Sequence, residues 1–219
     1  MISQSTYPPS TTDHLTKETI IDTRVMEIVI PREHLLSKAR KCASLLAKLE
    51  DFIGKLQDRA GIVKKEYLDG NAYYGCLNSN GKRDGPGIYV YSSNDVYFGA
   101  WKDNLLVEGN YIFQNGESFE GVVKNGKQGF GRYCYANGNV YEGEWRDDVK
   151  HGGGRMKYPN GDLYDGMWSK GKKNGQGKYS YANGIIYVGN FLDGKKNGFG
   201  EIIFPNGTKV EAYWNQTHI

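Results

Sequence analysis

The chain of 219 residues carries a formal net charge of +3 and contains 30 glycines and 17 tyrosines. This charge lacks the clustered positive surplus of a nucleic-acid-binding protein, and three cysteines at no CxxC spacing support neither a disulfide framework nor a zinc site. No segment reaches the roughly 18 apolar residues of a membrane span and the first residues lack a secretion signal, so we expect a soluble, cytoplasmic protein.

The N-terminal third differs in composition from the rest of the chain. Residues 1–23 are rich in Ser and Thr and contain Pro8-Pro9, so they offer little that could form a core and are predicted to be a flexible tail. Residues 24–31 could form one short extended segment. The ordered part of the chain is therefore expected to begin after this segment.

Residues 32–60 predict one long amphipathic helix. Pro31 lies where helices begin, and the apolar residues that follow recur at alternating steps of four and three, as in a heptad repeat. An apolar stripe of this width must be buried, which leaves two alternatives. The helix packs on its own repeat domain and covers the first edge of the sheet, or residues 32–59 pair with another chain in a homo- or hetero-oligomer. The stripe consists of Leu35, Ala39, Cys42, Leu46, Leu49, Ile53 and Leu56.

From residue 73 onward one five-residue pattern recurs six times: an aromatic residue, any residue, glycine, any residue, and then usually tryptophan or another apolar residue. A fixed period of this size is typical of stacked repeats. Side chains at i, i+2 and i+4 of a strand share a face, so each repeat is predicted to be a β-hairpin with its aromatic residues and glycines on one face. The repeats begin at Tyr73, Tyr97, Phe119, Tyr141, Tyr164 and Tyr187.

Glycine has a predicted role both in the strands and in the loops. Within the strands, its missing side chain would let a neighbouring ring lie flat against the backbone. Between repeats, Asn-Gly pairs such as Asn137-Gly138 predict tight turns in which both residues have positive φ, and Asn94 takes the place of glycine in one loop.

The fourth to sixth repeats resemble the MORN motif (membrane occupation and recognition nexus). They share its Tyr-x-Gly-x-Trp opening, its Gly-Lys-x-x-Gly-x-Gly middle and its Pro-Asn-Gly-Asp close. The resemblance covers about two thirds of the chain and implies a mainly β fold: an elongated, single-layer antiparallel β solenoid of MORN hairpins over residues 61–219, preceded by the long helix. About six repeats and terminal half units are expected. Cys76-Leu77 and Val123 depart from the motif, at positions where it has Glu-Trp and Trp.

No catalytic residue is predicted. The four histidines form no metal pattern, and no nucleophile and base pair is visible. The segment 166–173 imitates a phosphate-binding loop but has lysine where Ser or Thr is required. We therefore expect no enzyme activity, no metal, no cofactor and no small-molecule substrate.

Two sets of residues are candidate binding sites. Basic residues at equivalent loop positions should line one edge of the sheet, either as a solvated edge beside acidic neighbours or as a contact for an acidic surface, such as phospholipid. They are Lys82, Arg83, Lys127, Lys150, Lys172, Lys173, Lys195 and Lys196. The aromatic face either holds the hairpins together or accepts an amphipathic helix, from a partner or from residues 32–59. Its residues are Tyr141, Trp145, Tyr158, Tyr164, Trp168, Tyr181, Tyr187 and Phe191.

Three functions remain open. The first is a non-catalytic scaffold or adaptor that binds protein partners through the sheet groove and the N-terminal helix, in a cytoskeletal or ciliary assembly, as the resemblance to MORN-only proteins implies. The second is a peripheral membrane module that binds acidic phospholipids through the basic loop edge. The third is a regulatory subunit of a lipid kinase or methyltransferase, because MORN arrays also precede such domains.

Overall fold

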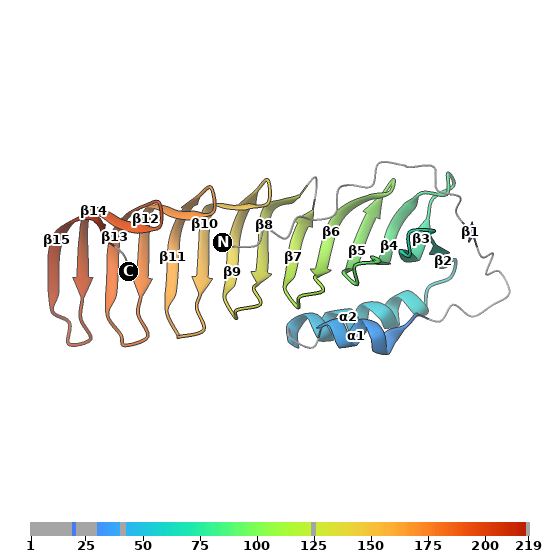
Figure 1. Cartoon of the computed structure of the whole chain (residues 1–219), viewed down its shortest axis with the longest axis horizontal. Coiled ribbons are helices and arrows are strands. Elements are labelled where there is room, and N and C mark those ends of the chain that lie inside the picture. Colours follow the sequence, from blue (N-terminus) through green and yellow to red (C-terminus); the bar gives the residue numbers. More distant parts are fainter. Residues whose placement is uncertain (1–18, 21–29, 40–42, 124–125, 218–219) are drawn as a thin grey trace. The chain divides into compact units, whose positions relative to one another are not determined.

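The computed structural model describes residues 19–20, 30–39, 43–123 and 126–217, and it divides into two compact units, residues 1–126 and 127–219 (Figure 1). Most of the predicted tail and short extended segment lies outside the described residues. Within the tail, Thr19–Ile20 form the strand β1, which pairs with β2.

Both units consist of antiparallel strands in which each strand pairs with the next one along the chain. The prediction of a mainly β, open sheet of hairpins is therefore confirmed. The first unit contains β2 (Val63–Glu66), β3 (Ala72–Leu77), β4 (Arg83–Val90), β5 (Val96–Lys102), β6 (Leu105–Ile112) and β7 (Ser118–Val123). The second contains β8 (Lys127–Cys134), β9 (Val140–Arg146), β10 (Val149–Lys157), β11 (Leu163–Ser169), β12 (Lys172–Ser180), β13 (Ile186–Leu192), β14 (Lys195–Ile203) and β15 (Lys209–Thr217).

The tyrosine that opens a repeat lies flat over two glycines. The Tyr141 ring covers Gly143 on its own strand and Gly154 on the next, and a Cβ on either glycine would collide with the ring. Its hydroxyl donates to the carbonyl oxygen of Glu144 at 2.9 Å. The interpretation that glycine makes room for a ring is therefore confirmed. The same bond, from the tyrosine to the residue three positions later, joins Tyr73 to Cys76, Tyr97 to Ala100, Tyr164 to Met167 and Tyr187 to Asn190.

The rings of successive repeats contact one another edge to face. The Trp168 centroid lies 5.2 Å from that of Tyr141 and 5.2 Å from that of Tyr164, with interplanar angles of 82° and 87°. Its indole Nε1 donates to the carbonyl oxygen of Gly154 at 3.0 Å. Such T-shaped pairs are favourable because the positive edge of one ring meets the negative face of another. In the second unit the contacts run through Trp145, Tyr141, Trp168, Tyr164, Phe191, Tyr187 and Trp214.

The loops between repeats differ from the predicted turn type. In the loop 135–139, Gly138 has a φ of 85° and its N–H donates to the carbonyl oxygen of Tyr135 at 2.9 Å. Asn137 keeps a negative φ, and its Oδ1 accepts the N–H of Asn139 at 3.0 Å. The expectation of two positive φ angles was therefore wrong here, because a three-residue loop with one left-handed glycine closes this connection.

Two consecutive positive φ angles occur instead at the turn inside the hairpin. Asp147 and Asp148, between β9 and β10, have φ angles of 48° and 66°. Asn94, with a φ of 69°, does take the place of a left-handed glycine, as predicted. Aspartate and asparagine tolerate this conformation better than other side chains because they bond to nearby backbone groups.

The prediction of one long helix was wrong. The structure contains α1 (Arg32–Ala39) and α2 (Ala43–Gln57), which lie side by side in Figure 1. Arg32 forms an ion pair with Glu50. In one continuous helix these residues would stand about 27 Å apart, so the chain must fold back between them. Two short helices can bury their apolar residues on the same few strands, which a single long helix could not do.

The two helices cover one face of β3 to β6. Leu35, Leu49 and Ile53 are completely buried there, and Phe52 meets Phe98 edge to face at 5.6 Å. Leu45 is buried while Leu46 of the predicted stripe is only partly buried, and Cys42 lies outside the described residues. The cluster also contains Ile30, Ala39, Leu56, Tyr74, Ile88, Val96 and Ile112.

This covered face is the one opposite the motif tyrosines. Tyr74 and Phe98 point into the helices, whereas Tyr73 and Tyr97, one residue earlier, lie over glycines on the other side. The helical residues thus pack on their own repeat domain, as one alternative had it, but they cover neither the aromatic face nor the first edge of the sheet, so these two placements were wrong. Rings that lie flat on the backbone of their own sheet have already buried the surface that a helix would need.

The glycines under the rings should tolerate no side chain. We expect Gly154→Ala to destabilise the second unit by about 1–3 kcal/mol or more, because its Cβ would collide with the Tyr141 ring. Gly153→Ala is the matched control, since its Cβ would point to the other face and meet nothing closer than Glu144 Oε1 at 3.5 Å. Urea unfolding followed by tryptophan fluorescence measures both. Equal stability of the two variants would contradict this packing.

The buried leucine of α2 should contribute more than its neighbour in the predicted stripe. Leu49→Ala is expected to cost about 2–5 kcal/mol of stability, because it leaves a cavity between α2 and the sheet. Leu46→Ala should cost less, since this side chain is partly exposed. Chemical denaturation of both variants tests the helix packing. A larger effect at Leu46 would show that another face of α2 is buried.

Candidate interaction surfaces

Each sheet has two faces with different residues. We call the side that carries the motif tyrosines and their glycines the tyrosine face, and the other side the opposite face. Away from the β-bulges, alternation along the strands assigns each strand residue to one of them. In β9, Tyr141, Gly143 and Trp145 lie on the tyrosine face, and Glu142 and Glu144 lie on the opposite face.

The tyrosine face contains a row of cations that lie on aromatic rings. Lys150 Nζ lies 4.5 Å from the centroid of Trp168, and Lys196 Nζ lies 4.5 Å from that of Trp214. Arg83, Lys127 and Lys173 occupy the equivalent position in other hairpins and lie 4.5, 5.2 and 4.8 Å from Trp101, Trp145 and Tyr179. A cation over a ring face is attracted by the negative potential of the ring.

This arrangement overturns part of the predicted basic edge. Arg83, Lys127 and Lys196 are buried, and Lys150 and Lys173 are partly buried. A solvent-exposed row is therefore the wrong description of these five residues. They follow the alternation of the strand, which points one residue of each basic pair inward.

The remaining basic residues are more accessible. Lys82 and Lys172 are exposed, and Lys195 is partly exposed. Lys172 forms an ion pair with Asp193 at 3.2 Å. Contact of these three residues with an acidic surface stays a prediction.

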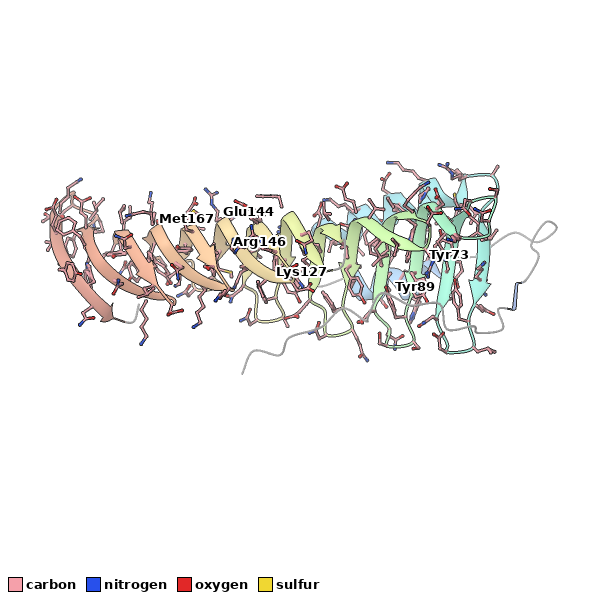
Figure 2. All side chains as sticks on the ribbon, turned by 90° about the horizontal axis from the view of Figure 1, so that it is seen from above. Tyr73, Tyr89, Lys127, Glu144, Arg146 and Met167 are labelled. Atoms are coloured by element: carbon pink, nitrogen blue, oxygen red, sulfur yellow. The ribbon has the colours of Figure 1, made fainter. Side chains whose placement is uncertain are left out.

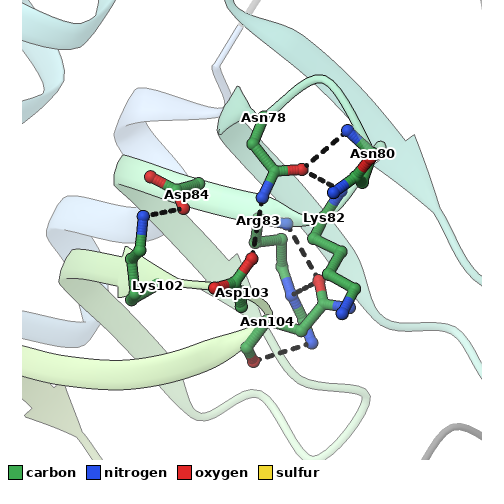
Figure 3. Close-up of polar contacts among 8 residues, drawn as sticks. All are labelled: Asn78, Asn80, Lys82, Arg83, Asp84, Lys102, Asp103 and Asn104. Atoms are coloured by element: carbon green, nitrogen blue, oxygen red, sulfur yellow. Dashed lines mark hydrogen bonds and ion pairs between the residues drawn. The ribbon is translucent and has the colours of Figure 1, made fainter.

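We call the five residues that lie on the rings the inward cations, and two of them, Arg83 and Lys127, are also held by polar groups of the neighbouring hairpin. The Arg83 backbone N–H donates to Asn104 Oδ1 at 2.8 Å, and its guanidinium donates to the same side chain (Figure 3). In the second unit the Lys127 N–H donates to Asp148 Oδ1 at 2.9 Å, and the Lys127 ammonium pairs with that oxygen at 3.0 Å. The asparagine or aspartate of one turn thus fixes the start of the preceding hairpin's second strand.

Burial shifts the ionisation of groups on the tyrosine face. Loss of hydration lowers the pKa of Lys150 to about 8, and it does the same to Lys173 with the nearby charge of Lys150 as a second cause. Burial also raises the pKa of Tyr158 to about 12 and raises the pKa of Tyr141 and Tyr164. These tyrosines therefore stay protonated at neutral pH.

Most of the predicted partner-binding aromatic residues are buried in this stack. Of the eight, only Tyr158 and Tyr181 are partly exposed. Their contact with a partner stays a prediction, and the area that they offer is small. The six buried rings are Tyr141, Trp145, Tyr164, Trp168, Tyr187 and Phe191.

The opposite face differs between the two units. In the first unit the residues in register across its middle include Tyr74, Ile88 and Phe98, which pack on the helices. In the second unit the middle row is charged and contains ion pairs from Arg132 to Glu142 at 2.9 Å and from Arg155 to Asp165 at 2.7 Å. Its members are Arg132, Glu142, Arg155, Asp165, Lys178, Val188, Glu201 and Glu211.

Large apolar side chains stand exposed next to this charged row. Phe130, Met167, Phe199 and Tyr213 on the opposite face have exposed fractions of 69%, 46%, 58% and 81%. Figure 2 labels Met167 and its neighbour Glu144 on this face. Sequence reasoning missed the surface, although the residue after each motif aromatic signals the difference between the faces: Tyr74 and Phe98 are apolar, whereas Glu142 and Asp165 are charged, and Val188 is again apolar.

The described residues contain no group of three or more His, Cys, Asp or Glu side chains that could hold a metal ion. None of the helices in the described ranges is long and apolar enough to cross a membrane.

A family model for the MORN repeat matches six consecutive segments of the sequence. The segments are residues 79–96, 97–118, 119–140, 141–163, 164–186 and 187–209, which together exceed half of the chain. The chain belongs to the MORN-repeat family. MORN repeats suggest a protein-interaction or membrane-associated module, and the ring and glycine packing described above accounts for the residues that define the motif.

No curated protein matches this MORN-repeat chain. Among solved structures, it is similar to the TCP domain of SAS-4 (dCPAP) from Drosophila melanogaster in complex with a proline-rich motif of Ana2 (dSTIL), with 17% identity, a TM-score of 0.47 and coverage of 71% of this chain and 86% of that chain. The TCP10c domain of Drosophila melanogaster Sas-4 has 16% identity, a TM-score of 0.45 and coverage of 72% and 96%. The microcephaly protein CPAP G-box domain has 10% identity, a TM-score of 0.41 and coverage of 70% and 87%.

The two lysines with lowered pKa values should make stability depend on pH. In the unfolded chain a lysine pKa lies near 10.4, so between about pH 8 and 10 the unfolded state holds protons that the folded state has released. Stability from these groups therefore rises with pH in this window. We expect the free energy of unfolding of the wild type, relative to that of a Lys150→Met, Lys173→Met variant, to increase from pH 7 to 9.5.

Urea unfolding at several pH values measures this difference. The tyrosines respond equally in both proteins, so the comparison isolates the lysines. A difference that does not change with pH would mean that the aromatic rings stabilise the ammonium groups as well as water does.

Proposed function

We propose that this MORN-repeat chain is a non-catalytic scaffold that binds protein partners, through the opposite face of its second unit, in a cytoskeletal or ciliary assembly of the cytoplasm. The observation that carries the proposal is the set of four large apolar side chains exposed on that face. Exposed apolar groups rimmed by charges are typical of protein-binding surfaces.

In this proposal the tyrosine face holds the hairpins together, and the opposite face of the second unit binds the partner. On the tyrosine face the rings already bury one another and the glycine backbone. In the first unit the opposite face is covered by α1 and α2. Among the described residues, no helix covers the opposite face of the second unit. Its strands are held by the ring stack on their other side, so a partner would meet a preformed surface.

The absence of catalysis is part of the proposal and is supported by the state of the polar groups. The tyrosines of the stack are held protonated by burial. The carboxylates of Glu142 and Asp165 lie in ion pairs on the surface of the sheet. A reaction site needs convergent groups with matched pKa values in a cleft, and these groups do not converge.

Acidic phospholipid is the competing partner. Five of the eight basic residues predicted for it lie inward on aromatic rings, so Lys82, Lys172 and Lys195 would have to carry the contact. Each basic residue near an acidic membrane contributes about 1 kcal/mol, which makes three a weak anchor. This comparison favours protein over lipid.

The proposal is tested with the tagged full chain, detergent-extracted cytoskeletons and vesicles that contain phosphatidylserine. We expect binding to the cytoskeletons, weakened about tenfold by the combined changes Phe130→Ser, Met167→Ser and Tyr213→Ser, because the exposed parts of these side chains contribute contact area. Co-sedimentation measures both. A variant with Lys82→Glu, Lys172→Glu and Lys195→Glu is the control and should bind the cytoskeletons normally. Binding to vesicles alone, lost in this lysine variant, would replace the scaffold with a membrane module.

A further inference from the structure

The charged row on the opposite face changes its pattern at the last two strands. From Arg132 to Lys178 each charge stands beside the opposite charge on the next strand. On β14 and β15, however, Glu201 and Glu211 are direct cross-strand partners. Like charges in this position destabilise a sheet, so this pair departs from the arrangement that the rest of the row follows.

Of the two glutamates, only Glu201 forms an ion pair within the described residues. Lys209 lies 3.0 Å from Glu201. Glu211 is exposed, and in the described part of the chain it forms no ion pair. Glu201, Glu211 and Lys209 together thus carry one excess negative charge at the surface.

Two aromatic rings stand beside these carboxylates. Phe199 and Tyr213 are cross-strand partners on the same face, with 58% and 81% of their surface exposed. Val188, which breaks the charged row on β13, is 39% exposed. We call Val188, Phe199, Glu201, Glu211 and Tyr213 the acidic aromatic patch.

Arginine is the side chain whose chemistry matches this combination. Its planar guanidinium stacks on aromatic rings and forms two parallel hydrogen bonds with a carboxylate. A guanidinium near Glu211 would also remove the repulsion between the two glutamates, while neighbouring apolar residues of the same segment could contact Phe199 and Val188.

We propose that the acidic aromatic patch docks a basic segment of a partner protein that carries arginine among apolar residues. This inference rests on the proposed function, and it adds the chemistry of the partner and the part of the face that recognises it. The same face contains an internal comparison. Phe130, on β8, is 69% exposed but stands beside the Arg132 and Glu142 ion pair, where the charges are already balanced.

The test uses the full chain and fluorescent short peptides that alternate arginine, lysine or glutamate with leucine. Anisotropy titration should show that the arginine peptide binds the wild type more tightly than the lysine peptide does. Only arginine has a planar guanidinium that stacks on an aromatic ring and forms two parallel hydrogen bonds with a carboxylate. Glu201→Gln combined with Glu211→Gln, and separately Tyr213→Ala, should each weaken arginine-peptide binding about tenfold or more. Leu105→Ala is the control, because this side chain is also 58% exposed but lies on β6 of the first unit, and it should leave the affinity unchanged.

Three results would overturn the patch assignment. They are an equal loss of affinity in Leu105→Ala, equal binding of the glutamate peptide, and sedimentation showing that Tyr213 holds together two copies of this chain. If the triple variant of the whole face loses cytoskeletal binding while the patch variants keep peptide binding unchanged, the scaffold proposal stands and this inference falls.

Discussion

The whole structure depends on a tyrosine ring that lies flat on two glycines and donates its hydroxyl to a carbonyl three residues later. The Tyr141 ring allows no Cβ at Gly143 or Gly154, and its edge supports the tryptophans of its own and the next hairpin. A two-stranded hairpin is marginal by itself, so this contact between consecutive hairpins supplies burial that a single-layer sheet otherwise lacks. The sequence repeats with a fixed period because each hairpin needs the same tyrosine and glycines for this interaction.

Because the rings fix one face, the other face is free to vary from repeat to repeat. The residue after the motif tyrosine is Tyr74 or Phe98 where the helices cover the sheet. It is Glu142 or Asp165 where none of the described helices does. A change of this residue leaves the ring stack intact and alters only what the opposite face can bind. Stability and recognition are therefore encoded at neighbouring positions of the same strand.

The hairpins and the role of glycine could be predicted because strand alternation and a strict period are local properties of the sequence. The helical segment could not, since a stripe at steps of four and three fits one long helix as well as two helices that fold back on the same strands. The basic pairs were misplaced for a different reason. Lys172-Lys173 was treated as loop, although extending the strand alternation to it would have sent Lys173 inward and Lys172 outward.

The inward cations show which property their position requires. In the repeat that begins at Tyr97, Leu106 pairs with Trp101 as Lys150 pairs with Trp145. A leucine can therefore stand where other hairpins have lysine, which means that the position needs an apolar stem on the rings and tolerates a charge at its end. Lysine meets this need because its methylene chain packs while the ring faces offset part of the lost hydration of the ammonium. The row of cations is thus a consequence of packing, and the surface that distinguishes one hairpin from another lies on the opposite side of the sheet.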